Sequence, residues 1–316
     1  MTSTNSNHTN ASRLCASRAV GLWVITAIYV IAIGIAVGVF AALPDWNVFA
    51  RILVADIVAT VFVWLAGVGL RNTSVYDPYW SVAPIAVVVG LALEAGRWST
   101  VTLLLLVAVG FWGVRLTLNW AHTFVNLGTQ DWRYDHFRAR FPRTYQLISL
   151  AGINLFPTVI VFGVLTPVIA LLIRPDDAAS AGWTRCGVNW LTLMGFAVSL
   201  GAATLQLVAD RQMHAFRAKH AGQGLLIRTG VWQYARHPNY LGEIAMWWGV
   251  WVMLVSIESR LWWLGVGALA NTLMFLIVSI PLADRRNRTT RTGFAEYAAE
   301  TNALIPLPIG RAKRTQ

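Results

Sequence analysis

The residues best suited to chemistry lie in one run of the sequence, Arg-His-Pro-Asn-Tyr-Leu-Gly-Glu at positions 236–243. Pro238 fits the first position of a helix, so a helix is predicted to begin there and to run to about Val255. Asn239 and Glu243 are four residues apart and therefore share one face of that helix. A helix start presents free N–H groups and partial positive charge, which suit a phosphate or another anion.

A second group of polar residues follows a helical spacing. Asp210, His214 and Arg217 stand at i, i+4 and i+7, so they share a helix face. An amphipathic extension on the bilayer surface would give the same pattern. Together with Arg236 and His237 they would suit a ligand with two or more phosphates, because guanidinium groups pair with phosphate through a rigid fork of donors. A dinucleotide or nucleoside cofactor is therefore predicted.

Three further acids stand out. Asp56 interrupts an apolar stretch, where ionisable groups are expensive and often functional, although a position near the membrane edge explains it equally well. Asp77 precedes Pro78 and is either functional or a helix cap. Asp131 opens a segment dense in charges and rings, which suits a loop packed on the bilayer or folded over a ligand.

The composition places these residues in a membrane protein. The 316 residues are 56% hydrophobic and only 12% charged, whereas soluble domains carry about 25% charged residues. Several stretches of about 18 or more residues are nearly free of charge, the length of a membrane-spanning helix. We therefore expect an all-α, polytopic bundle of eight spans. They are expected at 19–43, 52–70, 81–93, 100–118, 153–173, 188–209, 238–255 and 261–282.

The positive charge indicates the orientation of the bundle. The net charge is +11, which in a soluble protein would suggest nucleic acid. If both termini lie in the cytoplasm, 20 of the 25 Lys and Arg residues fall on the cytoplasmic side, as the positive-inside rule requires. We therefore expect no nucleic-acid partner. All the chemically dense segments then face the cytoplasm.

The chain is expected to form one domain over residues 19–306. A disordered polar tail is expected at 1–18 and a basic tail at 307–316. Cys15 and Cys186 form no CxxC pair, so neither a zinc site nor a disulfide framework is indicated.

Four motifs resemble those of the steroid 5-alpha-reductase-like membrane oxidoreductases, and most closely the bacterial branch of that superfamily. They are the runs 229–243, 131–134 (Asp-Trp-Arg-Tyr), 209–213 (Ala-Asp-Arg-Gln-Met) and 293–306. The resemblance covers roughly residues 75–306. It implies a helical bundle that holds NADPH on the cytoplasmic side and takes an enone-type lipid from the membrane.

In that family, hydride passes to the β-carbon of the enone while an acidic or phenolic group polarises the carbonyl. The catalytic residues implied here are Asp77, Tyr76 and Glu243. The Tyr that the family places on the fourth span is replaced by Trp112, so steroid specificity is not implied. The cofactor residues implied are Arg115, Arg133, Tyr134, Asp210, His214, Arg217, Arg236, His237, Asn239 and Tyr240.

The Arg-His-Pro run also resembles isoprenylcysteine and phospholipid methyltransferases, which bind S-adenosylmethionine at this helix start. The segment 131–134 and the Glu that follows Gly242 favour the reductase. A non-catalytic lipid-binding or transport protein is a third reading, although the interrupted, inverted halves typical of transporters are not evident. The expected partners are a lipophilic small molecule and membrane lipid. The expected location is the bacterial inner membrane, with the active site facing the cytoplasm.

Overall fold

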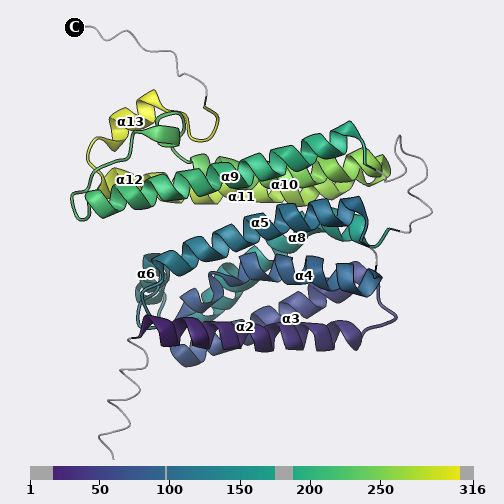
Figure 1. Ribbon diagram of the computed structural model, residues 1–316. Helices are drawn as coiled ribbons and strands as arrows, with labels where there is room; N and C mark the ends of the chain where they lie inside the picture. The colour runs from purple at the N-terminus through teal and green to yellow at the C-terminus, as the bar shows by residue number, and fades with distance from the viewer. Residues whose placement is uncertain (1–16, 97, 175–187, 307–316) are drawn as a thin grey trace, which may run out of the picture. The chain divides into compact units, whose positions relative to one another are not determined.

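The computed structural model describes residues 17–96, 98–174 and 188–306, and every regular element in these ranges is helical (Figure 1). Eight helical runs are long and apolar enough to cross a membrane, which confirms the expected all-α, multi-span fold. Most of the predicted N-terminal tail and all of the basic C-terminal tail lie outside the described residues. The single domain over 19–306 and the cytoplasmic placement of both termini stay predictions.

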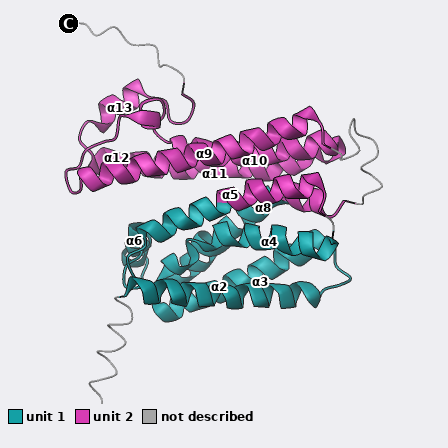
Figure 2. Cartoon of the chain, in the orientation of Figure 1, with its two compact units in different colours: residues 1–96, 113–165 teal, residues 97–112, 166–316 magenta. Residues whose placement is uncertain are grey.

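The chain divides into two compact units, which Figure 2 colours separately. Unit 1 comprises residues 1–96 and 113–165, and unit 2 comprises residues 97–112 and 166–316. Helix α5 (Thr100–Thr123) is divided between them after Trp112, and helix α8 (Phe156–Leu172) after Leu165.

The remaining elements each belong to one unit. Those of unit 1 are α2 (Arg18–Ala41), α3 (Val48–Leu70), η1 (Thr73–Tyr76), α4 (Tyr79–Ala95), α6 (Trp132–Arg140), α7 (Tyr145–Ile148) and η2 (Ser149–Leu155). Those of unit 2 are α9 (Trp190–Lys219), η4 (Gly230–Gln233), α10 (Pro238–Ile257), η5 (Ser259–Gly265), α11 (Val266–Met274), η6 (Phe275–Ser279), α12 (Ile280–Thr290) and α13 (Phe294–Glu300).

Two helix starts show how the sequence fixes these elements. Helix α10 begins at Pro238, as predicted, because the proline ring suits a first helical turn. Helix α9 begins with a capping box, in which the Asn189 side chain accepts hydrogen bonds from the N–H groups of Leu191 and Thr192. Helix α9 continues to Lys219, so Asp210, His214 and Arg217 do lie on one helix.

The structure corrects two of the expected boundaries. Helix α3 begins at Val48, about one turn before the predicted Ile52, so Asp56 lies deeper in the helix than its sequence position suggested. The segment expected to be a loop contains α6. That helix forms because the Asp131 carboxylate accepts from the backbone N–H of Arg133 at 2.8 Å and caps its start. Arginines in its last turn favour the same helix through its dipole.

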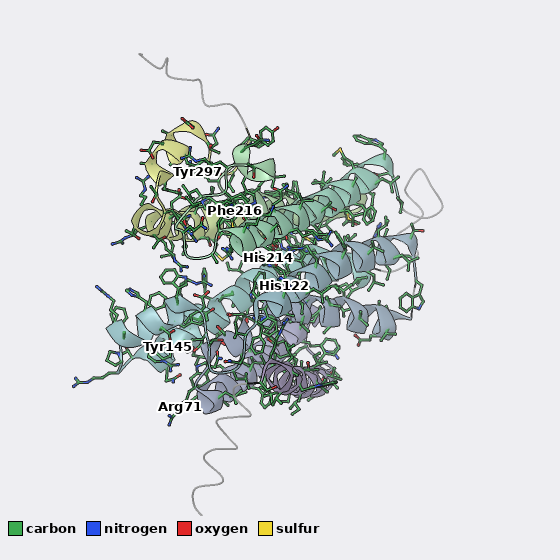
Figure 3. The ribbon with its side chains drawn as sticks, turned by 60° about the vertical axis from the view of Figure 1, so that its left-hand side comes forward. Arg71, His122, Tyr145, His214, Phe216 and Tyr297 are labelled. Atoms are coloured by element: carbon green, nitrogen blue, oxygen red, sulfur yellow. The ribbon has the colours of Figure 1, made fainter. Side chains whose placement is uncertain are left out.

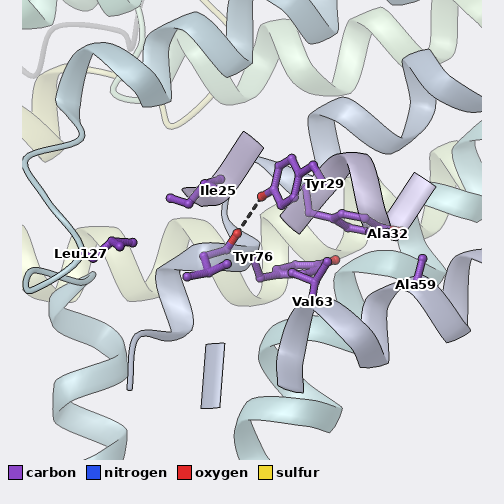
Figure 4. Close-up of a cluster of buried hydrophobic side chains, with 9 residues drawn as sticks. Ile25, Tyr29, Ala32, Ala59, Val63, Tyr76 and Leu127 are labelled. Atoms are coloured by element: carbon purple, nitrogen blue, oxygen red, sulfur yellow. Dashed lines mark hydrogen bonds between the residues drawn. The ribbon is translucent and has the colours of Figure 1, made fainter. Parts of the chain in front are cut away.

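The core of unit 1 joins α2, α3, η1 and the start of α4 around aromatic rings (Figure 4). The Tyr29 ring packs edge-on to Tyr79 at 5.7 Å between centroids, and Tyr76 lies 5.5 Å from Tyr79. The Tyr29 hydroxyl donates to the Val75 carbonyl at 2.6 Å. This bond ties α2 to η1, and so fixes the segment from which α4 begins.

Unit 2 is built on the close packing of α9 against α10. A Cβ atom on Gly242 would lie 2.6 Å from the Ala202 carbonyl oxygen, nearer than real Cβ contacts come. The Ser199 hydroxyl donates across the same contact to the Met246 carbonyl at 3.0 Å. Small residues therefore let the two backbones approach closely, as they do in membrane helix pairs generally.

Candidate functional site

Glu243, predicted from the sequence to be catalytic, is buried in unit 2 among three donors. Its carboxylate oxygens accept from the indole N–H of Trp112 at 2.8 Å, from the Gln206 amide at 3.1 Å and from the indole N–H of Trp247 at 2.8 Å. The two indole rings pack edge to face, 4.9 Å apart. Three helices, α5, α9 and α10, thus converge on one carboxylate. These hydrogen bonds from three helices fix the position of the Glu243 carboxylate.

The start of α10 is tied to α12 by a carboxylate that the sequence did not single out. His237 Nε2 lies 2.8 Å from one oxygen of Asp284, and Arg236 Nη2 donates to the other at 3.0 Å. The Tyr240 ring stacks on His237, with centroids 5.1 Å apart and planes 5° apart. In the sequence, Asp284 is the acidic first residue of an otherwise basic stretch. This contrast is the feature by which Asp284 could have been identified as a site residue.

The C-terminal segment also holds this helix start. The backbone N–H groups of Arg236 and His237 donate to the carbonyls of Asn302 and Ala303, both at 2.9 Å. The Tyr297 hydroxyl donates to the Trp232 carbonyl, and burial raises the pKa of this hydroxyl to about 12 (Figure 3). The motif around position 236 and the tail around position 300 thus form one substructure.

Positively charged side chains cluster near the C-terminal end of α9, where Arg217 lies. Arg217 interacts electrostatically with Arg286 and Arg291, and also with Asp210 two turns earlier on its own helix. The Arg291 guanidinium is anchored to the Leu225 carbonyl at 3.3 Å. The structure therefore brings the predicted Asp210 and Arg217 together, and adds Arg286 and Arg291, which were not among the residues predicted from the sequence. His214 lies between them on α9 (Figure 3), and Asn239 is half-buried in the first turn of α10.

In unit 1 a second acid, Asp56, pairs with a tyrosine. The Tyr79 hydroxyl donates to the Asp56 carboxylate at 2.7 Å, and only 5% and 8% of these two residues are exposed. Asp56 comes from the middle of α3 and Tyr79 from the first residue of α4. Asp56 was recognisable in the sequence as an ionisable group at membrane depth, but its partner was not.

This pair lines a cavity of about 380 Å³ between α2, α3 and α4. Most of its wall is aliphatic or small. The smallest wall residues are Ala32, Ala36, Ala41, Ala55, Ala83, Ala86 and Gly90. A buried acid and phenol that open into an apolar space are typical of a site that binds an apolar molecule through one polar group.

Asp77 and Tyr76, the predicted catalytic pair, are placed differently. The Asp77 carboxylate accepts from the Tyr134 hydroxyl at 2.6 Å, and the Tyr76 hydroxyl is hydrogen-bonded to Thr158 at 2.7 Å. Neither Asp77 nor Tyr76 is among the residues that line the cavity. Burial, together with the charge of Asp77, raises the pKa of the Tyr134 hydroxyl. These bonds join α6 and α8 to the segment before α4.

The same segment is bound to the loop before α6. The Asn72 amide donates to the carbonyls of Leu127 and Thr129 at 2.8 and 3.0 Å, and the Thr73 hydroxyl is hydrogen-bonded to Tyr145 at 2.7 Å. Arg133 forms a salt bridge with Asp131 at 2.8 Å, and Arg115 is buried on the unit 1 part of α5. Within unit 1, therefore, Tyr134 and Asp77 are brought together, whereas Arg133 pairs with its own helix cap.

Across the described residues, no group of three or more His, Cys, Asp or Glu side chains could hold a metal ion. The fold and these buried polar clusters define a multi-pass α-helical membrane protein. The chain belongs to the DUF1295 family, described as proteins of unknown function, whose family model matches residues 63–301. It is 23% identical over 242 residues to the uncharacterized protein C594.04c of Schizosaccharomyces pombe, covering 69% of this chain and 68% of that protein. No solved structure matches the chain.

Proposed function

We propose that this protein is a membrane-embedded, NADPH-dependent reductase of a C=C bond conjugated to a carbonyl in an apolar lipid. The observation that carries the proposal is the hydrogen-bonded pair of Asp56 and Tyr79 in the apolar cavity of unit 1. This pair takes the polarising role that the sequence resemblance assigned to Asp77 and Tyr76.

The chemistry needs a donor at the carbonyl oxygen. When bound, NADPH would supply a hydride to the β-carbon and leave as NADP⁺, and the α-carbon would take a proton from water. Negative charge then develops on the carbonyl oxygen, and a fixed hydrogen-bond donor stabilises it. The Tyr79 hydroxyl is such a donor, and Asp56 holds it at 2.7 Å. If Asp56 carries a proton, it can donate to the Tyr79 oxygen and leave the phenolic hydrogen for the substrate.

Unit 2 carries groups that fit a phosphorylated nucleotide. Arg217 interacts electrostatically with Arg286 and with Arg291. Guanidinium groups pair with phosphate through two parallel hydrogen bonds. Asp210, in the same cluster, can accept from ribose hydroxyls or orient an arginine. This donor set supports a cofactor with several phosphates and agrees with the family resemblance of the sequence around it.

The test begins with the purified full-length protein in lipid nanodiscs. Thermal shift and titration calorimetry with NADPH, NADH and S-adenosylmethionine should show the largest stabilisation by NADPH. Stabilisation by S-adenosylmethionine alone would favour the methyltransferase instead. Lipid-soluble enones are then screened by loss of NADPH absorbance, with mass spectrometry to confirm the gain of two hydrogens. Binding of NADPH without turnover of any enone would leave the cofactor assignment in place and remove the reductase.

A further inference from the structure

The unit 1 cavity carries two charged groups besides the Asp56–Tyr79 pair. Arg51 on α3 and Glu94 on α4 both line it. Helix α4 lines the cavity from Tyr79 to Glu94, about 22 Å of helix at 1.5 Å per residue. The cavity is therefore elongated along α4, with the acid–phenol pair at one end and Glu94 at the other. Arg51 stands about 7.5 Å before Asp56 on α3, and its side chain extends to the Phe40 carbonyl near the end of α2.

Arg51 is held in place by the end of α2. Its Nε and Nη2 atoms donate to the Phe40 carbonyl at 3.1 and 2.9 Å, and the guanidinium carbon lies 3.7 Å above the Phe40 ring. Phe40 lies about 16 Å along α2 from Tyr29, the ring that packs against Tyr79. Nη1 takes no part in these bonds, so one edge of the guanidinium can serve a ligand.

Glu94 supplies the opposite charge. It stands in the last turn of α4, and its side chain is exposed. No hydrogen bond or ion pair joins it to Arg51 in the described part of unit 1. The cavity thus offers an anchored donor and a free acceptor as separate groups.

These two charges limit what the far end of a bound molecule can be. A hydrocarbon end would remove water from both charges and return no hydrogen bond. An ionised end, whether anionic or cationic, would be repelled by one of the two side chains, because Glu94 is negative and Arg51 is positive. A hydroxyl or a carbonyl meets neither penalty, because it can accept from Arg51, and a hydroxyl can also donate to Glu94.

We propose that the cavity takes an elongated lipid whose far end carries an uncharged hydrogen-bonding group, a hydroxyl or a second carbonyl, recognised by Arg51 and Glu94. This inference rests on the proposed function for the position of the reacting carbonyl at Asp56 and Tyr79. Arg51 and Glu94 then determine specificity, and long lipids that end in a plain hydrocarbon tail are poor ligands.

The test uses saturated ketones of matched length, which bind but cannot be reduced. Three probes carry a methyl, a hydroxyl or a carboxylate at the end remote from the ketone. Their affinities for the full-length protein in nanodiscs are measured by quenching of tryptophan fluorescence. The hydroxyl probe should bind about tenfold more tightly than the methyl probe, as expected for a hydrogen bond to a charged group, and more tightly than the carboxylate probe.

The variants Arg51→Met and Glu94→Gln should each reduce the ratio of the affinities for the hydroxyl and methyl probes. The matched controls are Arg260→Met and Glu296→Gln, at exposed positions, which should leave this ratio unchanged. If Arg51→Met disrupts the end of α2, Glu94→Gln still decides, because the Glu94 side chain makes no hydrogen bond or ion pair with any other described residue. Equal binding of all probes, tightest binding of the carboxylate probe, or an unchanged ratio in Glu94→Gln would each overturn the inference.

The two proposals fail separately. An end-group preference in a protein that reduces no enone would keep the far-end assignment and remove the reductase. Reduction of enones with no end-group preference would do the opposite.

Discussion

Asp56 and Tyr79 show what a single hydrogen bond adds to a sequence position. An acid inside an apolar helix is expensive, and the Tyr79 hydroxyl offsets part of that cost by donating to it at 2.7 Å. The same bond fixes the phenol toward the cavity. The two residues are 23 positions apart on different helices, so only their packing makes them a pair.

The variant Tyr79→Phe removes the proposed donor to the carbonyl. Turnover should fall about 100-fold or more, because the loss of one such donor costs about that much in other enzymes. NADPH affinity, measured by calorimetry, should not change. The control is Tyr76→Phe, whose hydroxyl bonds to Thr158 and does not line the cavity. If Tyr76→Phe loses more activity than Tyr79→Phe, the original assignment to Tyr76 is restored.

Glu243 gives a prediction on stability. A glutamine at this position has one acceptor oxygen in place of two, so at least one of the three donors around it loses its partner. Glu243→Gln should therefore lower the free energy of unfolding by about 1–3 kcal/mol. Thermal denaturation in nanodiscs measures this, with the exposed Glu296→Gln as control. An unchanged melting temperature would show that Glu243 does not support the fold in this way.

At the scale of elements, the α9–α10 pair is the framework of unit 2. Its two helices carry Asp210, Arg217 and Asn239, which are predicted cofactor residues, and Glu243, which is predicted to be catalytic. Their close approach requires small residues where the backbones meet, above all Gly242. The run that predicts an anion site therefore also contains a packing determinant.

Gly242→Ala tests that packing. The new methyl group would lie 2.6 Å from the Ala202 carbonyl and would force the helices apart, so we expect about 1–3 kcal/mol of destabilisation. Gly201→Ala is the matched control on α9, where a Cβ atom meets nothing within 4 Å. That control should be neutral or slightly stabilising, because alanine favours a helix more than glycine does. Equal melting temperatures for the two variants would contradict the packing argument.

Helix α6 predicts a response to alkaline pH through Tyr134. Burial and the charge of Asp77 raise the pKa of the Tyr134 hydroxyl above its usual 10.0, so the folded protein holds this proton more tightly than the unfolded chain does. The resulting stability is present below about pH 10 and is lost as pH rises through the folded-state pKa. Tyr134→Phe should lower the melting temperature near neutral pH and flatten its decline above about pH 10. Tyr234→Phe, at an exposed position, should leave the curve unchanged.

At the scale of the whole molecule, the charge distribution predicts the orientation in the membrane. Most Lys and Arg residues lie on the links that we assign to the cytoplasm, together with both termini. A C-terminal fusion to green fluorescent protein should fluoresce in a bacterial host, and a fusion to alkaline phosphatase should be inactive. Alkaline phosphatase placed after Ser259 should be active, since that link is assigned outside. The reverse pattern would invert the topology.

The architecture was predictable from the sequence because long apolar stretches have few alternatives in a bilayer. The start of α10 at Pro238 followed from the geometry of proline, and the register of Asp210 and Arg217 followed from helical spacing. Helix α6 was not predicted, because its many charged and aromatic residues are also typical of a surface loop. Its start depends on the capping side chain of Asp131.

The candidate site, like the fold, was only partly predictable from the sequence. Which residues are polar in an apolar chain, which helix face each occupies and where a helix can start were all predictable, because these depend on near neighbours along the chain. The pairing of Asp56 with Tyr79, the contact of Asp284 with His237 and the position of Glu243 between two indoles became evident from the folded structure. Each of these contacts joins different helices, and their partners are set by how the helices pack.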